Sequence, residues 1–374
     1  MDLLIYETTH HETLPAMIDL ASLYFNNVYV YLKSSSYDNL VGMHSPEENW
    51  PKANFIKQPS DQSNRHFIGE CFSTIRRKKI SHLHISTLDN NLLYVAFQLM
   101  RSWRIKVSIS VQAINEYAAY RYDNLRDITE AAAKQVIHRR IKASRVFFPM
   151  MVQHMKNMMP SSEPVYIPPR FFEADNESPS SDKFRIAIPG SLDPKRRDYH
   201  LLEEFFSEFL SGGQFEKPIE LMILGNASGG YGQNIIRSLK KFESSSFALV
   251  SFDHYVKQSD YELHLRRADL IWSPIHLETK GIRNTPEKYG HTTATGLTGD
   301  LLFAPRPAMV PLGYIVPEHY ENTLITYQSI ADLAGWVQYF LEGRGKEKYE
   351  RINRDLSFFS KENFKPAFEK LMSL

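Results

Sequence analysis

The sequence predicts an α/β protein built from two successive doubly wound halves. Short apolar runs alternate with amphipathic stretches along the chain, as in mostly parallel sheets that are covered by helices on both faces. The alternation stops once, at the polar residues 173–183, and then starts again. The chain has 374 residues, which favours two domains over one because a domain usually holds about 100–200 residues.

The first half, residues 1–172, reads as one Rossmann-like domain. Strands are expected at residues 3–6, 28–32, 82–85, 105–111, 145–148 and 165–167, where three to seven residues form short apolar runs. Apolar residues recur at helical spacing in the stretches between them, so helices are expected at residues 14–23, before 75, at 92–103 and at 127–143.

The second half repeats this pattern after the linker, which is placed at residues 173–183. Strands are expected at residues 185–188, 220–224, 247–250, 270–272 and 308–310. Helices are expected at residues 200–210 and 232–242, and the last segment, 329–374, reads as helical. The second domain is therefore placed at residues 184–344, followed by a C-terminal helix at 345–374.

Composition excludes several classes of protein. The formal net charge is +1, whereas nucleic-acid-binding domains usually carry a strong basic excess. Cys71 is the single cysteine, so an intrachain disulfide and a cysteine-based zinc site are excluded. The sequence contains neither a signal peptide nor a run of about 18 apolar residues, so a cytoplasmic protein is expected, with membrane contact only at the surface. A dehydrogenase is disfavoured because no Gly-x-Gly-x-x-Gly follows the first strand.

A glycine-containing basic loop follows the first strand of the second half. Gly190 allows a ligand to approach the backbone closely. Lys195, Arg196 and Arg197 place positive charge just before a helix, an arrangement that suits a diphosphate. The alternative is an ordinary solvated basic turn.

A second loop, residues 287–300, is rich in small and hydroxyl residues near the start of a helix at Gly296. Free amides and hydroxyls at such a position can hold phosphate. Asp300 lies about one turn further on and could hold a ribose diol. The alternative is that Thr292, Thr293 and Thr295 only cap the helix.

These two loops resemble motifs of the large retaining family of GT-B glycosyltransferases that build bacterial polysaccharides (glycosyltransferase family 4-like, group 1). Gly190-Ser191-Leu192 and Arg196-Arg197 occupy the places of the family's Gly-Arg-Leu loop and of the cation that follows it. Glu287 with Gly290, and Asp300 with Pro307, match its paired-acid signature, although the second acid is Asp and the acids lie further apart than in the family. Glu278 is a rival for the first acid.

The resemblance implies a GT-B architecture, in which two Rossmann-like domains face each other across a cleft and the C-terminal helix crosses back to the first domain. It implies that the first domain is on the acceptor side, that the second binds a nucleotide sugar, and that catalysis retains configuration and needs no metal. Its donor-binding residues would be Gly190, Ser191, Arg196, Arg197, Tyr255, Val256, Gly290, Thr292, Thr293, Thr295, Gly296 and Asp300.

Catalytic and acceptor-side roles are expected from the resemblance and, for the histidines after the first strand, from their position in the chain. Glu287 would lie near the donor sugar or its phosphates, and His10 or His11 could deprotonate an acceptor hydroxyl. The acceptor-side candidates are Glu12, His84, Gln112 and Glu116. Gln112 stands where the family often has a histidine that touches the sugar. The polar loop and the buried strand remain the alternative interpretations of these histidines.

The predicted function is transfer of a sugar from a UDP- or GDP-sugar to a glycan, lipid-linked or other acceptor, in bacterial surface polysaccharide or glycoconjugate synthesis. No separate cofactor, metal or nucleic acid is expected. The alternatives are a nucleotide-sugar 2-epimerase and a catalytically silent partner that binds a nucleotide sugar or glycan. Basic residues at 76–79 and 134–145, with methionines at 150–159, are a candidate contact with anionic lipid at the inner face of the membrane; ordinary packing is the alternative.

Overall fold

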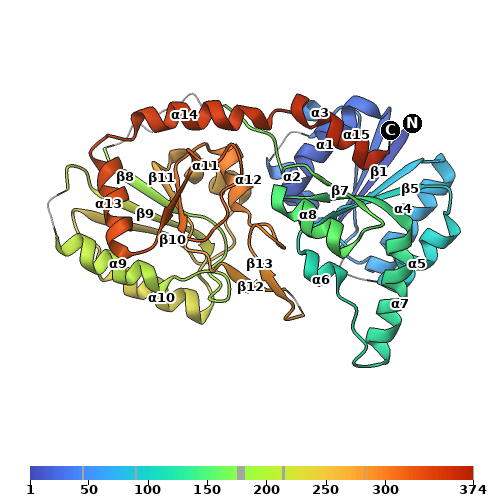
Figure 1. The fold of residues 1–374 in the computed structure, drawn as a ribbon, viewed down its shortest axis with the longest axis horizontal. Coiled ribbons are helices and arrows are strands. Elements are labelled where there is room, and N and C mark those ends of the chain that lie inside the picture. The colour runs from blue at the N-terminus through green and yellow to red at the C-terminus, as the bar shows by residue number, and fades with distance from the viewer. Residues whose placement is uncertain (44–45, 89–90, 175–181, 213–214, 282, 374) are drawn as a thin grey trace. The chain divides into compact units, whose positions relative to one another are not determined.

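The computed structural model describes residues 1–43, 46–88, 91–174, 182–212, 215–281 and 283–373. By their contacts these residues form two compact units, each with a parallel sheet flanked by helices (Figure 1). Unit 1 contains Met1–Phe171, Gly281–Ala294 and Ser360–Leu374. Unit 2 contains Phe172–Lys280 and Thr295–Phe359.

The sheet of unit 1 has seven parallel strands in the order β3-β2-β1-β4-β5-β6-β7. The strands are β1 (Asp2–Glu7), β2 (Asn27–Leu32), β3 (Ala53–Lys57), β4 (His82–Ile85), β5 (Lys106–Val111), β6 (Ile141–Val146) and β7 (Glu163–Tyr166). In β1, an interior strand, Leu3, Leu4 and Ile5 are fully buried, because helices cover both faces of a parallel sheet.

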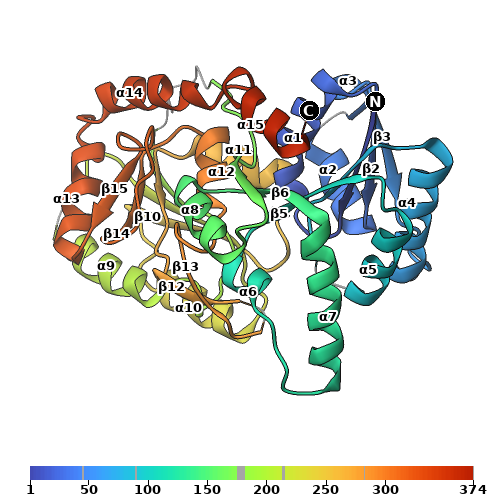
Figure 2. The same ribbon diagram turned by 45° about the vertical axis from the view of Figure 1, so that its right-hand side comes forward.

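The helices of unit 1 cover the two faces of this sheet (Figure 2). On one face α4 (Asn64–Lys78) contacts α5 (Leu92–Arg101), which contacts α7 (Leu125–Arg140). On the other, α15 (Lys365–Met372) packs on β5, β6 and β7, and its Phe368 stacks on Tyr24 at the end of α1 (Leu14–Tyr24). The remaining elements are η1 (His11–Thr13), α2 (Ser34–Met43), α3 (Pro46–Asn49), α6 (Ile114–Ala118), α8 (Pro149–Met158), β13 (Pro286–Lys288) and η3 (Glu362–Phe364).

Unit 2 has a six-stranded parallel sheet in the order β10-β9-β8-β11-β14-β15. Its strands are β8 (Phe184–Ile188), β9 (Ile219–Asn226), β10 (Phe247–Phe252), β11 (Leu270–Trp272), β14 (Ala308–Pro311) and β15 (Leu324–Tyr327). The other elements are α9 (His200–Ser211), α10 (Gly230–Lys240), α11 (Gln258–Arg267), β12 (Glu278–Lys280), α12 (Leu297–Phe303), α13 (Ile330–Leu341), α14 (Lys346–Leu356) and η2 (Ser357–Phe359).

The core of unit 2 is built around aromatic residues. Trp272, on the central strand β11, is fully buried and makes an edge contact with Phe205 of α9, with ring centroids 5.2 Å apart. Phe206, next to it in α9, packs on Phe247 of β10. Aromatic side chains bury large areas and prefer such edge contacts, so this cluster fixes α9 on the sheet that carries the candidate donor loops.

The structure differs from the sequence prediction in a few elements. The expected helix at 127–143 ends at Arg140, and its last residues belong to β6, whose β-branched and small residues are buried. β3 and β15 were not predicted; β3 is a half-buried edge strand with a weak apolar signal. The expected C-terminal helix is divided: α14 belongs to unit 2 and α15 to unit 1. Of the expected linker, residues 175–181 lie outside the described residues.

Candidate functional site

The candidate donor loop lies where the strand order of unit 2 reverses. The chain proceeds outward from β8 to β10 and then returns to β11 on the other side of β8. The loops after β8 and β11 therefore leave the carboxyl edge of the sheet side by side, at the point where doubly wound sheets bind ligands. The amide N–H of His276 donates to the Arg196 carbonyl at 2.9 Å, and that of Asp198 donates to the Pro274 carbonyl at 2.8 Å.

Gly190 and Arg197 form a close contact within this loop. Gly190 has a φ of +86°, a conformation that favours glycine, and a β-carbon there would lie 2.2 Å from Arg197 Nη2. Nη1 of Arg197 donates to the Ser191 carbonyl at 3.0 Å, while its Nε is buried without a hydrogen-bond partner. The loop therefore holds one guanidinium against the backbone, where it keeps a spare donor, next to the more exposed Arg196.

Asp300, in the first turn of α12, accepts a hydrogen bond from the Tyr261 hydroxyl at 3.0 Å. Because α12 leads into β14, its N-terminal end lies at the same carboxyl edge as the Gly190 loop. Gly296 is the N-cap residue, and the Thr295 hydroxyl accepts from the Leu297 amide at 3.3 Å, which is the capping role considered for it above. Among the other predicted donor residues, Tyr255 is exposed in the loop after β10, whereas Val256 is buried.

The equivalent position in unit 1 is occupied by Glu7. The strand order reverses between β1 and β4, and Glu7 is the last residue of β1. It is fully buried; its Oε1 accepts from the Thr87 hydroxyl at 2.6 Å and from three successive amides, those of Thr8, Thr9 and His10. Its Oε2 is buried without a hydrogen-bond partner. A single carboxylate thus ties together the loops that follow β1 and β4.

His10, His11 and Glu12 directly follow the loop that Glu7 holds. The Glu12 carboxylate lies 3.0 Å from Nδ1 of His10 and 3.6 Å from Nδ1 of His11. Burial lowers the pKa of His11, so its ring is neutral at pH 7. Its Nε2 is buried and has no hydrogen-bond partner in the structure. The three side chains predicted for acceptor chemistry therefore lie together, and a neutral imidazole is the form that can take a proton.

The predicted site residues of the second signature are divided between the two units. Gly281–Ala294 belongs to unit 1, so Glu287, Gly290, Thr292 and Thr293 lie in a different unit from Asp300. The segment is held by main-chain bonds: the Ile114 amide donates to the Thr292 carbonyl at 2.7 Å. The Thr292 hydroxyl accepts from the Lys288 amide, and Gly290 has a φ of +79°, so both shape a turn.

Glu287 and Glu116 meet where this segment contacts α6. Glu287 is buried, and its Oε1 accepts the Glu116 amide at 2.7 Å. The Oε2 atoms of both residues are buried without hydrogen-bond partners. Burial raises the pKa of Glu287; hydrogen bonds from Thr292 and from the Glu116 amide oppose the shift, and repulsion from Glu116 adds to it. The Ala294 amide donates to the carbonyl of Gln112, so two acceptor-side candidates, Gln112 and Glu116, contact the segment that carries Glu287. The catalytic role of Glu287 stays a prediction.

His84 lies in the core of unit 1. Its two ring nitrogens each lie 2.9 Å from a serine hydroxyl, those of Ser108 and Ser110 on β5. The ring is fully buried, and burial together with Arg145 lowers the pKa of His84 to about 3. Both nitrogens are thus engaged within the sheet, as in the buried-strand alternative.

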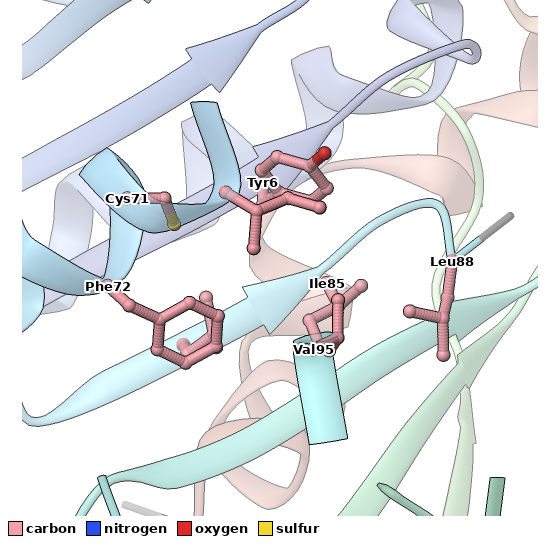
Figure 3. Close-up of a pocket in the computed structure, with 8 residues that line it drawn as sticks. Tyr6, Cys71, Phe72, Ile85, Leu88 and Val95 are labelled. Atoms are coloured by element: carbon pink, nitrogen blue, oxygen red, sulfur yellow. The ribbon is translucent and has the colours of Figure 1, made fainter. Parts of the chain in front are cut away.

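One apolar cavity lies in unit 1 beside Cys71 (Figure 3). It is lined by Tyr6, Ile68, Cys71, Phe72, Leu83, Ile85, Leu88 and Val95. Burial raises the pKa of the Cys71 thiol, so the sulfur is held in its neutral form. The lining offers no charged group for a nucleotide sugar, and this cavity is not the candidate site. Across the residues that the structure describes, no three His, Cys, Asp or Glu side chains gather in a group that could hold a metal.

Comparison with known proteins identifies the fold. No protein-family model and no curated protein sequence matches the chain. The solved structure of HepE from Anabaena, in complex with UDP and glucose, matches with a TM-score of 0.60 at 13% identity, over 100% of this chain and 99% of its own. A trehalose-phosphate synthase from Burkholderia vietnamiensis matches with a TM-score of 0.56 at 8% identity, over 100% of both chains.

The third comparison is with a UDP-GlcNAc 2-epimerase from Neisseria meningitidis, bound to UDP-GlcNAc, which matches with a TM-score of 0.54 at 11% identity over 100% of both chains. These likenesses confirm the predicted GT-B type of α/β fold with two Rossmann-like domains. At such low identity they show the fold alone, and the resemblance to one retaining family stays a prediction. In the part of the chain that the structure describes, no helix has the length and apolar character to cross a bilayer.

Two residues of these sites were missed by sequence reasoning. Glu7 carried a signal, since an acidic residue directly after a buried apolar strand lies at the carboxyl edge of a sheet. Tyr261, the partner of Asp300, carried none, because it comes from a helix 39 residues earlier in the chain.

Proposed function

We propose that the chain is a glycosyltransferase that uses a nucleoside-diphosphate sugar, a UDP- or GDP-sugar, as its donor. The observation that carries this proposal is the loop after β8, at the reversal of strand order in unit 2. There the guanidinium of Arg197 lies against Gly190, and its Nε is buried without a hydrogen-bond partner. A fixed guanidinium suits phosphate oxygens because it offers several donors in one plane.

In this proposal Arg196 and Arg197 neutralise the diphosphate as it leaves. Negative charge grows on the phosphate when the glycosidic bond breaks, and pre-placed donors stabilise it more than they stabilise the ground state. In this proposal the two arginines supply the positive charge that a divalent metal supplies to the leaving diphosphate in other transferases. Asp300, oriented by Tyr261, holds the ribose diol. Ser191, Tyr255, Val256, Thr295 and Gly296 complete the donor set at the same edge.

The acceptor-side groups are proposed to lie in unit 1. Neutral His11, or His10 beside it, takes the proton of an acceptor hydroxyl, and Glu12 stabilises the resulting imidazolium. Glu7 acts as a positioning residue that fixes the backbone of this loop. We further propose retention of configuration, a glycan or lipid-linked acceptor of a bacterial surface glycoconjugate, and a cytoplasmic site of action at the inner membrane face.

Two other functions remain candidates on specific observations. The same fold occurs in the UDP-GlcNAc 2-epimerase of Neisseria meningitidis, which is bound to UDP-GlcNAc, and this motivates an epimerase that needs no acceptor. Gln112 replaces the histidine expected beside the donor sugar, which motivates a silent partner that binds a nucleotide sugar without turning it over.

The three functions differ in what happens to the donor. We would incubate the chain with UDP-glucose, UDP-GlcNAc and GDP-mannose, with and without a panel of glycan and lipid-linked acceptors, and measure free nucleoside diphosphate and sugar epimers. Acceptor-dependent release of diphosphate supports the proposal, and Arg197→Ala should lower that release at least tenfold. Epimer formation without an acceptor shows an epimerase, and binding without either product shows the silent partner.

A further inference from the structure

Helix α5 has an exposed apolar face. Leu93, Phe97 and Met100 recur at spacings of four and three residues, so they lie along one side of the helix. They are 55%, 46% and 54% exposed, and Trp103, just past the end of the helix, is 68% exposed. Scattered exposed apolar residues are ordinary, but three large ones in line on one helix, with a fourth just past its end, mark an interaction surface.

Arginines surround this face from three helices. Arg101 lies over the ring of Phe97 with 5.6 Å to the centroid, and Arg104 lies over Trp103 with 5.1 Å. From α4, Arg76 donates to the side chain of Gln98 at 3.0 Å. From the end of α7, Arg140 donates to the carbonyl of Ile105 at 3.1 Å. The apolar face is therefore framed by cations of different elements.

The surrounding sequence is almost free of acids. Residues 71–115 contain seven Lys and Arg and a single acid, Asp89. Lys78 and Lys79 precede β4, and Lys106 begins β5, so they add charge at the amino edge of these neighbouring strands. The exposed acid nearest along the chain, Glu70, lies beside His66 at 3.4 Å on α4. Such a local excess is not visible in the whole chain, whose net charge is +1.

We propose that the exposed face of α5, with the arginines around it, docks on an anionic lipid surface. Trp, Phe, Leu and Met can enter the boundary between headgroups and acyl chains while Arg and Lys contact the phosphates. A second copy of the chain is disfavoured, because a symmetric contact would bring two sets of like charges together. A nucleic acid would leave Leu93 and Met100 without a partner, since its backbone offers phosphates rather than an apolar layer.

This surface shares basic residues with the lipid contact expected from the sequence, but its apolar residues differ. Of the methionines expected there, Met151, Met155 and Met159 are buried in unit 1, and Met150 and Met158 are exposed on α8. The C-terminal end of α5 lies at the amino edge of the sheet, opposite the edge that carries Glu7, His10 and His11. Docking by this surface therefore leaves the candidate acceptor-side loop uncovered.

The test is sedimentation of the full chain with sucrose-loaded vesicles, either of phosphatidylcholine alone or containing phosphatidylglycerol. The inference predicts binding to the anionic vesicles that weakens as salt is raised, and little binding to the neutral ones. The double variant Phe97→Ser with Trp103→Ser, and separately Arg101→Gln with Arg104→Gln, should each lower the bound fraction at equal lipid at least tenfold in the partition coefficient. The matched control is Leu263→Ser with Leu312→Ser, two exposed leucines of unit 2.

Since all of these side chains are exposed, the variants should keep the thermal midpoint of the wild type, which a melting curve checks. The proposal is overturned if the wild type ignores anionic vesicles at low salt, or if the α5 variants bind as well as the control. It is also overturned if the α5 variants instead abolish self-association or binding to a random RNA. Vesicle binding needs no nucleotide or sugar, so failure here is separate from failure of the proposed transferase function.

Discussion

The two units reverse their strand order in the same way but fill the point of reversal with opposite chemistry. In unit 1 a fully buried acid, Glu7, accepts hydrogen bonds from the loops that follow β1 and β4. In unit 2 a glycine, Gly190, allows Arg197 to lie against the backbone beside the loop that follows β11. The Glu7 carboxylate accepts the hydrogen bonds of the donors around it, whereas the guanidinium of Arg197 beside Gly190 keeps one donor without a partner. The first arrangement stabilises two loops of unit 1, and the second leaves a guanidinium with a donor that an anion could use.

This contrast predicts the largest effect on stability at Glu7. Glu7→Ala leaves three successive amides and the Thr87 hydroxyl without their acceptor, and should lower the free energy of unfolding by about 3 kcal/mol. Urea denaturation followed by circular dichroism measures this. The control Glu12→Ala, whose side chain is half-exposed, should change it by less than about 0.5 kcal/mol. Equal effects of the two substitutions would mean that Glu7 does not organise the loop.

The opposite behaviour is expected at Arg197. Arg197→Ala should hardly alter unfolding, but should weaken binding of a nucleoside diphosphate by about tenfold to a hundredfold, because charge-assisted hydrogen bonds contribute about 1.5–3 kcal/mol. Calorimetric titration of the variant beside Lys195→Ala, an exposed cation of the same loop, measures the difference. If both variants bind equally well, the loop after β8 is only a basic turn.

A substitution of Gly190 should lower both the stability of the fold and the affinity for a diphosphate, each by less than the substitutions above. Alanine at a φ of +86° is strained, and its β-carbon would push Arg197 away, so Gly190→Ala should cost about 1–2 kcal/mol of stability and weaken diphosphate binding by about threefold to tenfold. Gly229→Ala serves as the control, because Gly229 has an ordinary φ of −75° and open space around it. If the Gly190 variant bound the diphosphate with wild-type affinity, Gly190 would not be part of the binding site.

The smallest expected effect concerns Glu287 and depends on pH. Burial raises the pKa of Glu287, so the protonated form favours the fold: this contribution is complete below the ordinary pKa of 4.5 and is lost as the pH rises through the folded value. Glu287→Gln keeps the acceptor for the Glu116 amide and removes the charge. It should therefore be more stable than the wild type, by a difference that grows as the pH rises above about 4.5.

Denaturation midpoints of this variant and of Glu278→Gln, an exposed control, should be compared at several pH values from about 4.5 upwards. A difference between Glu287→Gln and the wild type that does not change with pH would show that the buried acid is not the source of the effect.

The sequence predicted the alternation of strands and helices and the loop of Gly190 and Arg197, because both depend on local patterns. Periodicity and a glycine beside cations can be recognised without knowledge of distant contacts. It did not predict that Gly281–Ala294 belongs to unit 1 although the residues on both sides of it belong to unit 2. This assignment depends on main-chain bonds to residues around 112–116, which are far away in the sequence. Glu287 and Asp300 look like one signature in the sequence, but they lie in different units.

His84 shows a second limit of the same kind. A histidine that alternates with apolar residues on a strand can face a ligand or the core, and its spacing does not distinguish the two. The outcome is decided by Ser108 and Ser110 of the neighbouring strand, which engage both ring nitrogens. The exposed face of α5 shows the reverse case, where an apolar period that normally indicates burial is instead exposed on the surface of unit 1.

The most direct test of the central claim is isothermal titration of the full chain with UDP, GDP and NAD, repeated with Arg197→Ala and with Asp300→Asn. The account predicts saturable one-to-one binding of one nucleoside diphosphate, strongly weakened in both variants, and no binding of NAD. Binding of NAD alone, or of no nucleoside diphosphate, would contradict it and would leave the loop after β8 without a ligand.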